Sequence, residues 1–235
     1  MLSRPLRAWL ALRLERNADD EVFCPQFTNQ FRDEEPEAVV ELLERETARL
    51  LARMPVFLQK VRLPGRTGPR ADLDVLHESY LQSHEIVKEF FQHAFEFRIE
   101  APGRFVRAIE MQHLLGQLEE STFGVARLAL SAESSSPTFA MLRNTLVESV
   151  DFMLHTTIDC FDGSNEKDRL IFEAVTSDKG PLIAEMREAH LDDAEHLSRA
   201  EQAALLALLI HFEALVNQMH QLGVRRQAAI ASGAG

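Results

Sequence analysis

The sequence predicts an all-α fold of six long antiparallel helices, arranged as two three-helix bundles. Apolar residues recur at steps of three and four along the chain, which places them on one stripe of a helix. Clusters of Pro, Gly, Ser and Asn divide the chain into stretches of roughly 25 to 30 residues. One Tyr, one Trp and 10 Gly are few for a sheet-rich fold, which favours aromatic and β-branched residues and glycine turns.

Five of the stretches carry a continuous apolar stripe with helical spacing. The stripes run from Val39 to Val61, Leu73 to Ala94, Phe105 to Val125, Phe139 to Thr157, and Leu205 to Leu222. A further stretch, about 166–191, is interrupted by Gly180-Pro181, where we expect a kink or a short break. Pro55 should also bend the first helix, because proline removes a backbone donor.

Start signals agree with these limits. Ser198 and Glu201 have the spacing of a capping box. Ser136 followed by Pro137 predicts an N-cap and a proline at the first helical position, and Pro102 can open a helix in the same way.

The helices divide into two triplets at a serine-rich linker, 134–136. We predict a first three-helix bundle over residues 36–132 and a second over 137–226. Residues 1–35 are expected to form a basic amphipathic segment followed by an acidic linker, and residues 227–235 a disordered tail.

The amino-terminal segment, residues 1–16, is basic in an otherwise acidic chain. Its uninterrupted apolar run, from Ala8 to Leu12, is too short for a signal-peptide core or a membrane span. It is either a frayed or packed terminal helix, or a basic segment that lies on an anionic membrane surface. Cys24 and Cys160 form no metal-binding spacing, so we expect a cytoplasmic protein, either free or peripheral to the inner membrane.

Charge argues against one class of partner. The chain has 37 acidic and 25 basic residues, a formal net charge of −12. This balance repels phosphate backbones, so nucleic acid is not expected to bind.

The chain contains none of the common nucleotide-binding, zinc-protease or serine-hydrolase motifs, and we expect no enzyme activity and no cofactor. Glu110 and His113 form one E-x-x-H pair, but a di-iron site needs two such pairs with further glutamates. His77 and His84 are seven residues apart on one helix face, too far apart for one metal ion. They are expected to form hydrogen bonds between helices.

Several segments resemble the PhoU-like helical domain found as the cytoplasmic C-terminal region of bacterial sodium/phosphate cotransporters. The similar segments are residues 38–51 with Arg45-Glu46, residues 177–180, and residues 205–213, whose Leu-rich run ends in Phe212-Glu213. The resemblance implies a pair of three-helix bundles that regulates phosphate uptake through protein contacts.

PhoU proteins also carry E-x-x-x-D motifs whose carboxylates hold metal ions. The resemblance places the two copies at residues 113–117 and 213–217, which begin with His113 and Glu213. Only Glu213 keeps a carboxylate, so any metal ion held by these two side chains would be bound weakly.

Three functions follow as hypotheses. The first is a non-enzymatic regulatory or adaptor module that binds a membrane phosphate transporter or sensor protein. The second is a ferritin-like metal-binding enzyme using Glu110, His113, Glu213 and His220. The third is a helical scaffold or oligomerisation module, and a homodimer is compatible with each.

Overall fold

The computed structural model describes residues 36–62, 69–94, 102–131, 136–162, 165–177 and 197–233. Every regular element in these ranges is a helix, and they contain no strand, which confirms the predicted all-α class. The helices are α2 (Pro36–Arg53), α3 (Pro55–Arg62), α4 (Pro69–Ala94), α5 (Pro102–Ser131), α6 (Pro137–Asp162), α7 (Glu166–Ser177) and α9 (Arg199–Gly233). Residues 1–16, the Gly180-Pro181 break and Cys24 lie outside the described residues, as does most of the serine-rich linker.

Proline opens five of these helices, at positions 36, 55, 69, 102 and 137. A proline suits the first helical position, because the backbone N–H that it lacks would have no partner there. Pro55 divides the first predicted helix into α2 and α3, with a turn at Met54 between them. The bend predicted at Pro55 is therefore a break in the helix. The disordered tail predicted over 227–235 is wrong for residues 227–233, which continue α9.

The predicted caps are present. The Glu201 backbone N–H donates to Ser198 Oγ at 3.3 Å, and the Ser198 N–H donates to Glu201 Oε2 at 2.8 Å. This reciprocal pair is a capping box. Ser136 Oγ accepts from the Phe139 N–H at 3.4 Å at the start of α6.

The predicted stripes form the hydrophobic core. All of their described members are buried except Val61, which is half-buried. The buried members are Leu43, Thr47, Leu50, Met54 and Phe57; Leu73, Leu76, Tyr80, Val87 and Phe91; Phe105, Ala108, Leu115, Leu118, Thr122 and Val125; Phe139, Leu142, Leu146, Met153 and Thr157; and Leu205, Leu209, Phe212, Val216, Met219 and Leu222.

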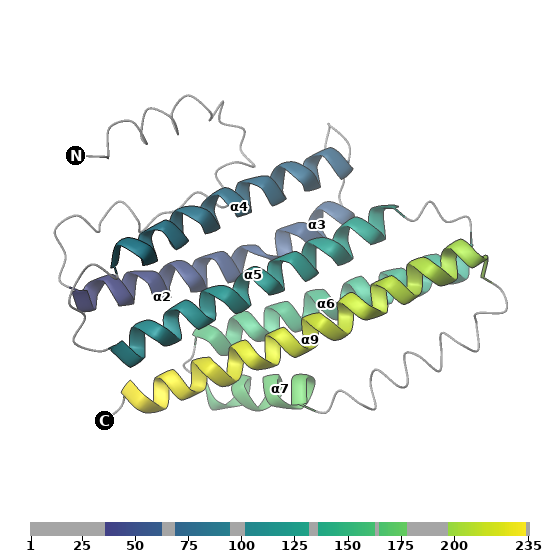
Figure 1. Ribbon diagram of the computed structural model, residues 1–235. Coiled ribbons are helices and arrows are strands. Elements are labelled where there is room, and N and C mark those ends of the chain that lie inside the picture. Colours follow the sequence, from purple (N-terminus) through teal and green to yellow (C-terminus); the bar gives the residue numbers. More distant parts are fainter. Residues whose placement is uncertain are drawn as a thin grey trace, which may run out of the picture.

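Helix α5 lies at the centre of the bundle (Figure 1). It contacts α2, α3 and α4 from its own half of the chain, and α6 and α9 from the other half. Its most extensive contact is with α9, which runs antiparallel to it. One continuous core therefore joins the two predicted triplets, and their division into two bundles stays a prediction.

Helix α9 contains a long apolar stretch. Over Arg199–Ala228 its length and composition would allow it to cross a membrane. Only 39% of its most apolar window is buried in the bundle. Its buried residues pack on α5, α6 and α7, as expected of a core helix, and Leu206, Ile210 and Val224 are exposed on it.

Candidate functional site

A line of polar side chains is buried between α4 and α5, and His77 and Glu119 form its strongest contact. His77 Nδ1 lies 2.7 Å from Glu119 Oε1. Glu119 is 1% exposed and the His77 side chain 24% exposed. The imidazole also stacks on Phe123, with ring centroids 3.8 Å apart and an interplanar angle of 5°. His77 therefore joins the two helices through both a polar and an aromatic contact.

Burial controls the protonation of this line. Loss of water raises the pKa of Glu119, although the hydrogen bond and charge of His77 oppose the change. Burial also raises the pKa of Tyr80 well above its usual value, and the nearby Glu119 carboxylate adds to that effect. The Tyr80 hydroxyl donates to the Leu115 carbonyl at 3.5 Å.

His84 continues the line one helical step further on. Its Nε2 lies 3.3 Å from the Gln112 carbonyl, and its ring stacks on Tyr80 with centroids 6.1 Å apart. Burial lowers the pKa of His84, with the Gln112 hydrogen bond acting against it, so the neutral imidazole is favoured. The interhelical hydrogen bonds predicted for His77 and His84 are confirmed.

Gln112 links the line to α2. Its Nε2 donates to Thr47 Oγ1 at 2.5 Å, and Thr47 donates in turn to the Leu43 carbonyl at 2.8 Å. Gln112 Oε1 is buried and has no hydrogen-bond partner among the described residues. The polar line thus spans three helices. Its contacts fix the register of α2, α4 and α5.

The two predicted metal ligands lie apart. His113 is exposed on α5, where its Nε2 lies 3.0 Å from Gln117 Nε2. Glu213 is half-buried on α9, two residues from His211, which packs on Gly124 of α5. Because α9 runs antiparallel to α5, Glu213 lies level with about residue 122, nine residues from His113, or about 14 Å along the helix. The structure therefore does not bring His113 and Glu213 together.

The other members of the ferritin-like hypothesis have different partners. Glu110 forms an ion pair with Arg225 across the α5–α9 contact. His220 Nδ1 lies 3.1 Å from Thr176 Oγ1, and its ring stacks on Phe172. No group of three metal-binding side chains occurs in the part of the chain that the structure describes.

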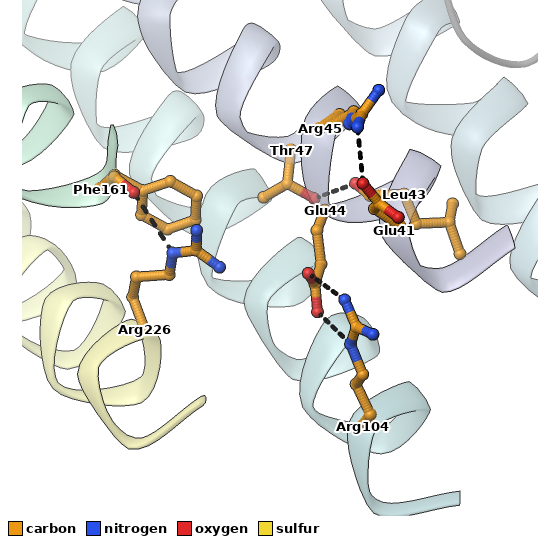
Figure 2. Close-up of polar contacts among 8 residues, drawn as sticks. All are labelled: Glu41, Leu43, Glu44, Arg45, Thr47, Arg104, Phe161 and Arg226. Carbon is orange, nitrogen blue, oxygen red and sulfur yellow. Dashed lines mark hydrogen bonds and ion pairs between the residues drawn. The ribbon is translucent and has the colours of Figure 1, made fainter. Parts of the chain in front are cut away.

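Further charged contacts connect the helices near the end of the bundle that holds the start of α5 and the end of α9 (Figure 2). Arg104 donates two hydrogen bonds to Glu44, at 2.9 and 3.1 Å. Arg226 donates to the Phe161 carbonyl at 3.2 Å, and its guanidinium lies 5.1 Å from the centre of the Phe161 ring. These contacts stabilise α5 against α2 and α9 against α6.

Large apolar side chains are exposed on two outer helices. On α6, Met141 is 56% and Phe152 58% exposed, and on α9, Leu206 is 60% and Ile210 58% exposed. Met141 and Phe152 are 11 residues apart, about three helical turns, so they share one face of α6. These side chains contribute little to the core and are candidates for contacts with a partner.

Glu119 and the exposed side chains of α6 and α9 were not predicted from the sequence. Glu119 lies between the predicted core residues Leu118 and Thr122 and carries no motif. Only its position facing His77 on the neighbouring helix gives it a role. The exposed apolar residues of α6 and α9 each lie among polar residues, and such single apolar residues are common on protein surfaces.

Comparison of the chain with protein families, with curated proteins and with solved structures found no match.

Proposed function

We propose that this chain is a non-enzymatic regulatory or adaptor module of phosphate transport, which binds a membrane transporter or sensor protein. The observation that carries the proposal is the pair of large apolar side chains, Met141 and Phe152, exposed on one side of α6. A partner that covers this side of α6 would remove the apolar surface of both side chains from water, which favours binding.

The buried polar groups have structural contacts within the bundle. His77, His84, Glu119 and Gln112 contact one another's helices, and those contacts hold α4 and α5 in place.

The phosphate part of the proposal rests on the PhoU-like resemblance of α2 and α9. In the segment that resembles the family's early helix, Glu46 is fully buried and pairs with Arg49 at 2.5 Å. In the similar segment of α9, Leu205, Leu209 and Phe212 are core residues. The similar positions thus belong to the packing of a helical bundle, which is what a shared fold requires.

The test uses a strain that lacks the gene and measures uptake of radiolabelled phosphate. We expect the deletion to change uptake and the wild-type chain to restore it. Phe152→Glu should fail to restore it, because a charge in place of this apolar side chain opposes desolvation by the partner. Val106→Glu is the matched control, since Val106 is 50% exposed on another helix, and it should restore uptake.

Two outcomes would overturn the proposal. Uptake that is unchanged by the deletion would remove the link to phosphate. Stoichiometric iron or manganese in protein purified without a tag would favour the ferritin-like enzyme instead. Circular dichroism of Phe152→Glu must first match the wild type, so that a loss of binding is not a loss of fold.

A further inference from the structure

The outer face of α9 has a symmetric pattern of side chains. Eight residues form an outward-facing stripe along the helix: Ala203, Leu206, Ile210, Glu213, Asn217, Gln221, Val224 and Ala228. All of them are exposed except Glu213, which is half-buried, and the stripe is about 38 Å long at 1.5 Å per residue. It lies opposite the buried stripe that packs on α5, and in Figure 1 α9 passes in front of α6.

We propose that this stripe binds the same stripe of a second copy, so that two α9 helices pair antiparallel about a two-fold axis next to Leu215. A two-fold interface needs a surface that is complementary to itself. Around Leu215 the stripe meets this condition, because residues at nearly equal distances from that point suit each other in size, and three of the four pairs also match in polarity. The pairs are Ala203 with Ala228, Leu206 with Val224, Ile210 with the aliphatic part of Gln221, and Glu213 with Asn217.

Charge does not prevent a second copy from binding at this surface. Two chains of net charge −12 repel each other over most of their surfaces. The α9 stripe contains one charged residue, Glu213. In the antiparallel register each Glu213 lies opposite the amide of Asn217 of the other copy, so that the two like charges are not placed against each other.

The size of the stripe predicts a reversible dimer. Stable interfaces use about 20 to 30 residues on each side, whereas this stripe has eight. We therefore expect association at micromolar concentrations. The interface lies on α9 and leaves the α6 face free, so it is independent of the proposed function.

The experiment is sedimentation of the full chain over a concentration series of about 1 to 100 µM, a range that brackets a micromolar dissociation constant. The wild type should shift from monomer to dimer. Leu206→Glu and Val224→Lys should each weaken the dimer at least about tenfold, because each places a charge against an apolar partner. Val106→Glu, exposed elsewhere, should dimerise as the wild type does.

Mixing the two weakened variants tests the register. In the proposed pairing, a heterodimer has two contacts between positions 206 and 224. One of them joins the introduced glutamate to the introduced lysine, whose charges attract, and the other keeps the native Leu206 and Val224. Native mass spectrometry of Leu206→Glu mixed with Val224→Lys should therefore show more heterodimer than either variant shows homodimer. Circular dichroism of both variants should match the wild type, since both native side chains are exposed.

Three results would overturn the dimer. The first is a wild type that stays monomeric over the whole series. The second is a Leu206→Glu variant that dimerises as strongly as the wild type. The third is a mixture of the two variants that forms no more heterodimer than homodimer. A wild-type monomer that floats with lipid vesicles would assign the stripe to a membrane surface instead.

Discussion

At the residue scale, Glu119 shows how a bundle of apolar helices holds a carboxylate. The side chain is 1% exposed, and its described partner is His77, at 2.7 Å. A buried ion without a partner is strongly destabilising, and removing one member of a buried pair typically costs about 3 kcal/mol or more. His77→Ala should therefore destabilise the fold by about 3 kcal/mol, the low end of that range, because part of the imidazole is exposed to water.

The raised pKa of Glu119 predicts a pH dependence of stability. The folded chain holds this proton more tightly than the unfolded chain, whose carboxyl titrates at about pH 4.3. The contribution of Glu119 is thus fully present below about pH 4.3 and is lost as the pH rises through the raised value. Glu119→Gln should remove this loss of stability. The free energy of unfolding of the variant, relative to that of the wild type, should therefore increase as the pH rises from about 4.3 through the raised pKa of Glu119.

Urea unfolding at a series of pH values measures both effects. Glu148→Gln is the control, because Glu148 is exposed on α6 and is not among the groups that shift the pKa of Glu119. It should leave the pH profile close to that of the wild type. A Glu119→Gln profile parallel to the wild-type profile would show that burial does not control this carboxyl.

At the element scale, the ends of the helices were more predictable from the sequence than their arrangement. Prolines and caps act within one helical turn, so Pro102, Ser136 and the Ser198 capping box could be located without tertiary contacts. The apolar stripes identified the buried faces for the same reason. The central place of α5 was not predicted, because its contacts with α9 join residues far apart in the sequence, such as Gly124 and His211.

The same limit applies to the candidate site. A spacing of four residues predicts that two side chains share a helix face, but the level at which two helices meet depends on their packing. His211 against Gly124, and Glu110 against Arg225, set the register of α5 and α9. That register separates His113 from Glu213, and no local pattern in the sequence encodes it.

The packing of α7 on α9 depends on the absence of a side chain at Gly223. A Cβ at this position would lie 2.2 Å from Phe172 Cζ, and Phe172 is fully buried between α7 and α9. Overpacking of this kind costs about 1 to 3 kcal/mol, against a gain of about 1 kcal/mol in helix propensity. Gly223→Ala should therefore give a net destabilisation of about 1 kcal/mol, measured by urea unfolding.

Gly103 provides the matched control on α5. The nearest side-chain atom to a Cβ there is Arg107 Nη1, at 3.9 Å, which is an ordinary contact. Gly103→Ala should be neutral or stabilising by up to about 1 kcal/mol. If contact with the ring of Phe172 causes the destabilisation by Gly223→Ala, the double variant Phe172→Leu, Gly223→Ala should be more stable than the sum of the two single-variant changes predicts. If the two changes in the free energy of unfolding add, the destabilisation has another cause.

At the scale of the whole molecule, the packing of α5 on α9 joins the two halves of the chain. The core includes residues from every helix from α2 to α9 that is described, apart from α7, whose Phe172 is buried and whose Val175 packs against it. Small domains with one continuous core usually unfold in a single transition. Two independent bundles, over 36–132 and 137–226, would instead unfold separately.

The chain contains one probe in each half that can decide between these possibilities. Tyr80 is the only tyrosine and is buried in α4, and Cys160 is a free, buried thiol in α6. In a Trp9→Phe, Cys24→Ser background, tyrosine absorbance follows the first half during urea unfolding, and labelling of the thiol follows the second. We expect the two transitions to coincide, because loss of either half exposes the apolar face of α5 or α9 that the other half covers. Transitions at clearly different urea concentrations would mean that each triplet is stable without that contact, and would favour the two-bundle division predicted from the sequence.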